Sequence, residues 1–266
     1  MLTIDIDFVI HQLNQIAAQL KETFAQIEPA ISLDQMFQVF KKIDGQAAAT
    51  LQAALAKAYP HIGWLDGELE NADAWAQISQ DDYWICDALD GAIQYVRGIP
   101  SWCTTLTLLS KGRPVFAVII DAMNGEIFHA TEGGGAFLNA KPIRVNQRLS
   151  HYEGMVATSQ PPFISRMPAE ILQAANSLAR VLPEVMAVRN LGPTSLQLAY
   201  VACGRLDAFW EFGEDGFNCA GAALLVREAG GTASDAGGQP YSPQSASLLA
   251  ATPGAHASML ATLAGI

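Results

Sequence analysis

The stretch "DYWICDALDGAIQY", residues 82–95, joins a strand-like apolar run to two acidic residues and a glycine. Asp87 and Asp90 are three residues apart, and Gly91 follows the second carboxylate directly. Two carboxylates held this close repel each other unless a cation neutralises them. Hard divalent cations take oxygen ligands, and the backbone carbonyl of Leu89 is a further candidate. The stretch predicts a metal site where a strand turns into a helix, although an ordinary Asx turn that caps the helix would use the same residues.

The residues after the second acid predict an anion site. Gly91 allows the backbone to turn tightly, and the N–H groups of Gly91 and Ala92 open the expected helix. The first N–H groups of a helix have no partner within it, and the helix dipole is positive there, so anions are favoured. Phosphate is the expected anion.

The composition limits which kinds of protein this chain can be. Its 266 residues, half of them apolar, suit one large domain or two small ones with a substantial core. The net charge of −11 argues against a nucleic-acid partner, because such proteins usually present a basic face. No apolar run is long enough for a membrane span, and the N-terminus has no signal-peptide pattern. Four scattered cysteines fit neither a disulfide framework nor a zinc motif, which favours a reducing, cytoplasmic setting.

Hydrophobic periodicity predicts a mixed α and β chain. Apolar residues at steps of three and four predict helices over residues 9–27 and 47–59. Strand-like runs separated by Gly, Pro and Asn then predict an antiparallel meander that ends at "GAFLN". The strand "RLDAFWEF" and the helical segments "MPAEILQAANSLARVLPE", "TSLQLAYVACG" and "NCAGAALLVREAGG" follow. The shift from strand-rich to helix-rich sequence predicts two halves, residues 1–148 with the metal site and residues 149–266; the family resemblance described below implies that the second half completes the substrate pocket.

Four motifs follow one another in a set order along the chain. They are "GE" at 67–68, "WICDALDG" at 84–91, "GGGAFLNAKPIRV" at 133–145 and "AGAALLVREAGG" at 220–231. Over roughly residues 6–256 the chain resembles the inositol monophosphatase family of metal-dependent phosphatases. That family reads Gly-Glu-Glu, then Asp-Pro-Ile/Leu-Asp-Gly-Thr, then Trp-Asp-x-Ala-Ala/Gly before a helix ending in Glu-Ala-Gly-Gly. The resemblance implies an α/β fold, a layered α/β/α/β/α sandwich of the inositol monophosphatase and fructose bisphosphatase type, usually as a homodimer.

The resemblance also implies a Mg²⁺ site at the junction of the two halves. The residues that match the family's metal ligands, or stand in their place, are Glu68, Asp87, Leu89 through its carbonyl, Asp90 and Asn218. The amides of Gly91 and Ala92 match the family's phosphate cradle. Glu68 is also expected to be catalytic, with Asp44 orienting the group that activates water and Glu211 contacting substrate hydroxyls. The implied substrate is a small phosphorylated polyol, sugar or nucleotide.

The chain departs from the family's pattern at four places near the expected site. Ala92 replaces the Thr whose hydroxyl helps to activate the attacking water, and Asn218 replaces the Asp that binds a second metal. Leu69 replaces the second Glu of Gly-Glu-Glu. The segment 37–44, expected as a loop, carries two lysines where the family has Asp-x-Val-Thr. Loss of proton-transfer assistance alone lowers a rate by roughly 10²–10⁴.

These observations leave alternative functions open. The first is a Mg²⁺-dependent phosphomonoesterase with weakened or altered catalysis. The second is a catalytically inactive relative that binds a phosphorylated ligand or a protein partner, and a third is a different chemistry on the same scaffold. A serine hydrolase is unsupported, because Ser195 lacks the Gly-x-Ser-x-Gly context. The expected partners are a small phosphorylated substrate and a second copy of the chain, without nucleic acid or membrane.

Overall fold

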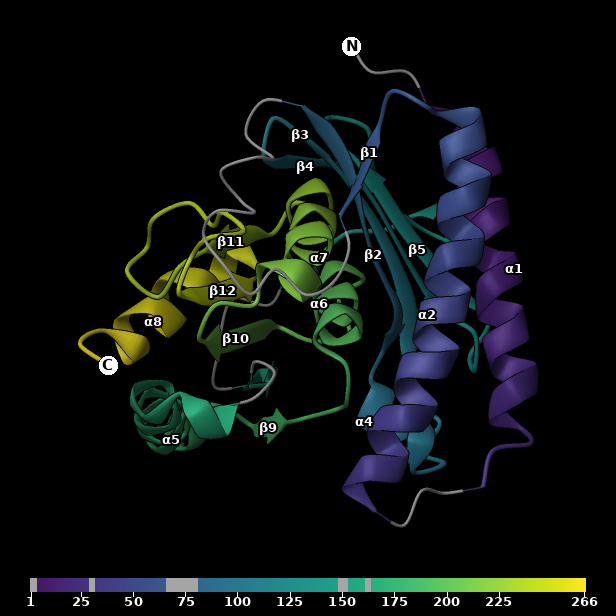
Figure 1. The fold of residues 1–266 in the computed structure, drawn as a ribbon. Helices are drawn as coiled ribbons and strands as arrows, with labels where there is room; N and C mark the ends of the chain where they lie inside the picture. The colour runs from purple at the N-terminus through teal and green to yellow at the C-terminus, as the bar shows by residue number, and fades with distance from the viewer. Residues whose placement is uncertain (1–3, 29–31, 66–80, 148–152, 161–163) are drawn as a thin grey trace.

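The computed structural model places the helices and sheets of this chain in alternating layers (Figure 1). The residues described are 4–28, 32–65, 81–147, 153–160 and 164–266. Two helices cover one face of a first sheet, two more lie between that sheet and a second, and a last pair covers the outer face of the second sheet. The predicted α/β/α/β/α sandwich is confirmed.

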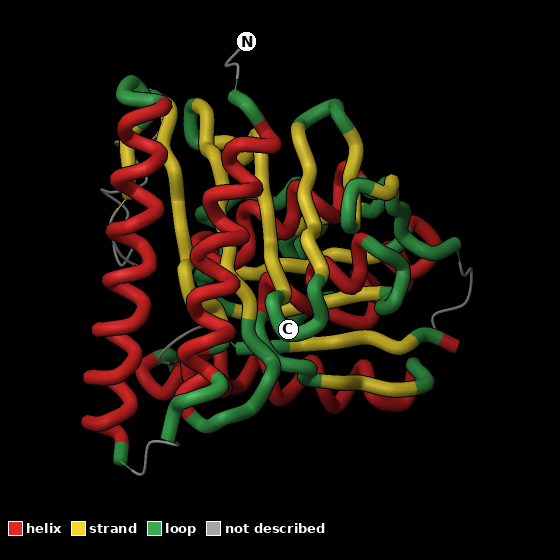
Figure 2. The backbone as a smooth tube through the Cα atoms, turned by 90° about the vertical axis from the view of Figure 1, so that its right-hand side faces the viewer, coloured by secondary structure: helices red, strands yellow, loops and turns green. Residues whose placement is uncertain are grey.

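The outer pair of helices is α1 (Ile6–Phe24) and α2 (Leu33–Ala58). Figure 2 shows them side by side across the face of the first sheet. The side chain of Asp5 accepts the N–H of Phe8 and so caps α1, which buries an apolar stripe against the sheet.

Helix α2 differs from its prediction at the N-terminal end. It begins at Leu33, with the hydroxyl of Ser32 accepting the N–H of Gln35, so the predicted loop at 37–44 and the predicted start at residue 47 were wrong. The helix runs through Gly45, which costs about 1 kcal/mol relative to Ala and is tolerated when the surrounding residues favour the helix. Asp44 is therefore held on a rigid element.

The first sheet contains the predicted meander. Its strands lie in chain order, and every pair from β2 to β7 is antiparallel, while β1 runs parallel to β2. The strands are β1 (Gly63–Leu65), β2 (Asp82–Asp90), β3 (Cys103–Ser110), β4 (Arg113–Asp121), β5 (Glu126–Thr131), β6 (Gly135–Leu138) and β7 (Lys141–Pro142). Helices cover both faces, and the central strands β3 and β4 are accordingly buried almost throughout.

The second sheet has the order β11-β12-β10-β8-β9. Its strands are β8 (Met155–Thr158), β9 (Ala187–Arg189), β10 (Ala208–Phe212), β11 (Thr232–Ser234) and β12 (Ser247–Ala251). The helices of this part are α5 (Pro168–Val181), α6 (Thr194–Ala202), α7 (Gly216–Glu228) and α8 (Pro253–Leu263), with short 3₁₀ turns at Ile164–Arg166 and Leu182–Glu184. The boundary between two halves near residue 148 stays a prediction.

Helices α6 and α7 form the middle layer and are buried on nearly all sides. Small residues let α7 approach the first sheet closely: a Cβ atom at Gly221 would lie 2.0 Å from the Thr107 hydroxyl. The start of α7 is thereby held against the first sheet. Among the described helices, none has the length and apolarity needed to cross a bilayer.

Candidate functional site

The turn at the end of β2 brings the two acids of the opening motif together. Asp87 pairs with Thr105 of β3 and Asp90 with Cys103, and the register shifts between these pairs as a β-bulge. The predicted turn from strand to helix is confirmed, because Gly91 with φ of 92° caps the short helix α4 (Ala92–Val96). A Cβ atom at Gly91 would lie 2.7 Å from the Pro193 ring and 3.0 Å from a backbone oxygen, so the turn requires glycine.

Asp90 is buried and is linked to the C-terminal part of the chain through Ser195. Its Oδ2 accepts the backbone N–H of Ser195 at 3.2 Å, and the Cys103 thiol lies 3.7 Å away. The hydroxyl of Ser195 in turn donates to the backbone carbonyl of Asn218 at 3.0 Å. Burial raises the pKa of the Asp90 carboxyl, while the hydrogen bonds from Ser195 oppose that shift. One residue of α6 thus joins the β2 turn to α7.

Two further acids meet at the backbone of Leu89. The N–H of Leu89 donates to Oδ1 of Asp87 at 3.0 Å and also to the carboxyl of Asp44 on α2. Burial raises the pKa of Asp44, and this hydrogen bond opposes the shift. The structure therefore places Asp44 behind the turn that holds Asp87 and Asp90.

The opposite wall of the site is the N-terminus of α7. The side-chain NH₂ group of Asn218 donates to Oδ1 of Asp215 at 2.8 Å, and the Asn218 carbonyl oxygen Oδ1 is buried with no hydrogen-bond partner. Candidate ligand atoms of Glu211, Asp215 and Cys219 lie within 4.8 Å of one another. Burial raises the pKa of the Cys219 thiol well above its usual range, so this sulfur is protonated and a poor metal ligand.

Glu211 lies behind that wall. It is 2% exposed, and its Oε2 accepts the hydroxyl of Thr194 at 3.2 Å. Burial, and then the neighbouring Asp215 carboxylate, raise the pKa of Glu211 well above its usual range, so the folded protein favours its neutral form. Thr194 and Asp215 line the cavity described next, with Glu211 behind them.

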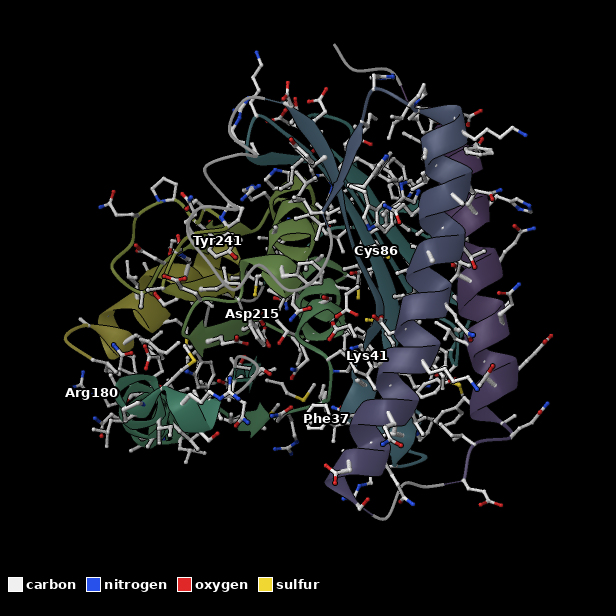
Figure 3. The ribbon with its side chains drawn as sticks, viewed as in Figure 1. Phe37, Lys41, Cys86, Arg180, Asp215 and Tyr241 are labelled. Carbon is white, nitrogen blue, oxygen red and sulfur yellow. The ribbon has the colours of Figure 1, made fainter. Side chains whose placement is uncertain are left out.

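A cavity of about 550 Å³ opens between α2, the β2 turn and the starts of α6 and α7. One wall carries the oxygen atoms of Asp87, Asp90, Asp215 and Asn218. The other wall is mainly apolar and consists of Met36, Phe37, Phe40, Ile93 and Val96. Figure 3 shows Phe37 on α2 and Asp215 in the interior, on opposite sides of this space. Within the part of the chain that the structure describes, no lysine or arginine lines the cavity, so a bound phosphate needs a cation.

The structure gathers most of the predicted site residues around this cavity. Those that line it are Asp87, Leu89, Asp90, Gly91, Ala92 and Asn218, with Asp44 directly behind. Glu68 and Leu69 lie outside the described residues. Sequence reasoning missed Ser195 and Asp215 as parts of the site. The available signal for Asp215 was its position three residues before Asn218 at a helix start, which puts both side chains on one helix face.

The donor set fits a hard divalent cation. Two carboxylates and a backbone carbonyl come from the β2 turn, and carboxylate and carbonyl oxygens are the ligands that Mg²⁺ and Ca²⁺ prefer. The buried Oδ1 of Asn218 lacks a donor, and a cation would satisfy this oxygen.

Comparisons with known proteins place this chain in a family. A sequence profile of the inositol monophosphatase family matches residues 6–265. "Nus factor SuhB" of Pseudomonas aeruginosa is 37% identical over 201 residues, which cover 73% of this chain and 71% of that protein. "Inositol-1-monophosphatase" of Rhizobium meliloti is 34% identical over 212 residues, covering 79% and 77%.

Solved structures share the fold over almost the whole length. The extragenic suppressor protein suhB of Bartonella henselae superposes with a TM-score of 0.80 at 27% identity, covering 97% of this chain and 98% of that one. The inositol monophosphatase of Anabaena gives a TM-score of 0.80 at 23% identity, covering 97% and 94%. With the profile match over nearly every residue, these findings show that the chain belongs to the inositol monophosphatase family.

Proposed function

We propose that this protein is a Mg²⁺-dependent phosphomonoesterase with weakened catalysis, acting on a small phosphorylated polyol, sugar or nucleotide. The observation that carries the proposal is the cavity wall of Asp87, Asp90 and Asn218 beside the glycine turn at Gly91. It offers oxygen ligands for a cation next to backbone N–H groups that suit a phosphate. Membership of the inositol monophosphatase family supports the same reaction class.

Each residue of the β2 turn has a role in this proposal. Asp87, Asp90, the carbonyl of Leu89 and the side-chain oxygen of Asn218 would hold Mg²⁺, with Glu68 as a further ligand from the sequence motif. When bound, the cation stabilises negative charge on the phosphate and lowers the pKa of coordinated water. The N–H groups of Gly91 and Ala92 bind phosphate oxygens, which holds the phosphorus atom in position for attack.

The expected weakness of catalysis comes from Ala92. Its methyl group lies at the cavity where the family's threonine offers a hydroxyl, so one partner for the attacking water is missing. Asp44 accepts a hydrogen bond from the backbone of Leu89, which supports its expected role of orienting the water-activating group from behind the turn. We expect turnover lower than in relatives with the threonine, by roughly 10²–10⁴.

A second candidate function is binding of a protein partner without turnover. It is favoured by the names of relatives 35–38% identical to this chain, which are called Nus factor SuhB, and by the loss of the hydroxyl at residue 92. In this function the cavity would keep a cation and a phosphate group as structural ligands. The homodimer and the cytoplasmic setting stay predictions in both cases.

Phosphate release from a panel of small phosphate esters, with and without Mg²⁺, tests the proposed function. We expect slow, Mg²⁺-dependent release that Asp90→Asn abolishes, because the substitution removes the charge of a buried carboxylate on the cavity wall. Glu214→Gln is the matched control: this exposed acid is four residues from Asn218, and its loss should leave release unchanged. Binding of Mg²⁺ and phosphate by calorimetry without release from any ester would favour the second function instead.

A further inference from the structure

The side chain of Asn218 has a fixed orientation, and Asp215 is the reason. An amide presents two N–H donors on one side and a carbonyl acceptor on the other, whereas an ionised carboxylate only accepts. The amide facing Oδ1 of Asp215 at 2.8 Å must therefore turn its NH₂ group toward that carboxylate. This leaves Oδ1 of Asn218 on the other side, buried and without a donor.

Asp215 is itself held from behind by a buried chain of contacts. The Thr194 hydroxyl donates to Oε2 of Glu211, and the Glu211 carboxyl lies within hydrogen-bonding reach of Asp215. Asp215 is 8% exposed and Glu211 is 2% exposed, so water does not compete for these contacts. This series of side-chain contacts ends at the Asn218 amide, on the cavity wall that also carries Asp90.

We propose that Asp215 is a positioning residue that directs the side-chain oxygen of Asn218 toward a bound divalent cation. This inference rests on the proposed function for the presence of the cation. A neutral amide is a usable ligand only in one of its two orientations, because the flipped amide would point two N–H groups at a positive charge. Asp215 fixes the usable one. It acts through Asn218 and adds negative charge beside that ligand.

The orientation can be tested by comparing Asp215→Asn in two backgrounds. In the wild type, an asparagine at 215 can donate its own NH₂ group to Asn218 and so allow the flipped amide. We expect Mg²⁺ affinity, measured by calorimetry with the metal alone, to fall about 10- to 100-fold. In Asn218→Asp, either oxygen of the new carboxylate can bind the cation, so orientation no longer matters. There Asp215→Asn removes only a nearby negative charge, so the loss of Mg²⁺ affinity should be several-fold smaller than in the wild type.

A charge effect and an orientation effect give different results in this comparison. If Asp215 acted only through its charge, the substitution would weaken Mg²⁺ binding by a similar factor in both backgrounds, which would overturn the proposal. Glu214→Gln, which removes a neighbouring exposed charge, should change affinity less than about 2-fold. Wild-type protein that binds no Mg²⁺ would refute the proposed function as well. The wild-type titration is therefore done first, so that this failure is distinguished from a failure of the orientation effect.

A second measurement does not depend on how well the variants fold. In metal-free wild-type protein, the side-chain N–H groups of Asn218 should exchange slowly with solvent by NMR, because one of them is bonded to Asp215. Fast exchange of both N–H groups would contradict the fixed orientation and overturn the proposal.

Discussion

Gly221→Ala should destabilise the protein through the contact between α7 and the first sheet. The new Cβ atom would lie 2.0 Å from the Thr107 hydroxyl oxygen and 3.0 Å from the Ala117 Cβ. Non-bonded heavy atoms prefer about 3.5–4.0 Å, so α7 or Thr107 must move by more than about 1 Å. Because α7 carries Asn218, a shift of this helix also moves one wall of the cavity.

The magnitude follows from two opposing terms. Overpacking of a buried site costs about 1–3 kcal/mol, and so short a contact with a sheet places this one near the upper end. Alanine favours a helix over glycine by about 1 kcal/mol, which offsets part of that cost. The net loss of unfolding free energy is about 2 kcal/mol. At roughly 2–4 °C per kcal/mol for a chain of this size, Tm should fall by about 4–8 °C.

Thermal unfolding followed by circular dichroism measures this change, with two variants for comparison. Gly45→Ala makes the same substitution in α2, where nothing lies within 4 Å of the new Cβ atom, and should raise stability by about 0.5–1 kcal/mol. Thr107→Ala should cost less in the Gly221→Ala background than in the wild type, because it removes the closest clashing atom. A Gly221→Ala protein as stable as the Gly45→Ala protein would show that α7 does not pack this closely.

Three further outcomes are expected. Ala92→Thr and Asn218→Asp should each raise phosphatase turnover. The double variant should gain more than the product of the two single gains, because the hydroxyl and the charged ligand serve one attacking water. Kinetics across a Mg²⁺ titration measure these gains, and no gain in any variant would count against a phosphatase. Burial lowers the pKa of His129 below 6.5, so the unfolded chain binds a proton that the folded protein does not, and stability falls as pH drops below 6.5. His129→Phe, which cannot titrate, should flatten that loss in pH-dependent denaturant titrations, and an unchanged slope would exclude His129 as its source. Tyr95→Phe should cost about 0.5–1.5 kcal/mol, because it removes the hydrogen bond that the buried Tyr95 hydroxyl donates to the Leu20 carbonyl at 2.7 Å. Chemical denaturation midpoints that coincide for the two proteins would contradict this expectation.

Local patterns in the sequence predicted the parts of the fold that depend on local physics. The meander followed from apolar strands separated by turn residues, and the β2 turn followed from Asp87, Asp90 and Gly91 within five residues. The early start of α2 was missed because residues 37–44 were interpreted as a loop, whereas the helix begins at the Ser32 cap and continues through Gly45.

The wall contributed by α6 and α7 could not be predicted in the same way. Ser195 contacts Asp90 across 105 residues of sequence, and only the packing of the middle layer brings them together. The sequence excluded Ser195 as a hydrolase nucleophile, but no sequence motif indicates its structural role of linking Asp90 to Asn218. Asp215 was not singled out, because its spacing from Asn218 indicates a shared helix face but does not show that its carboxylate is buried.

The link that Ser195 makes between the β2 turn and α7 has a consequence for how the chain folds. A polypeptide that has paired its first sheet but not yet docked its middle layer has Asp87 and Asp90 without the opposing wall. Such an intermediate would bind divalent ions only weakly, so tight ion binding is expected only after the middle layer has docked. Millimolar Mg²⁺ should then slow unfolding more than it speeds refolding, since it binds the finished state and not the partly built one.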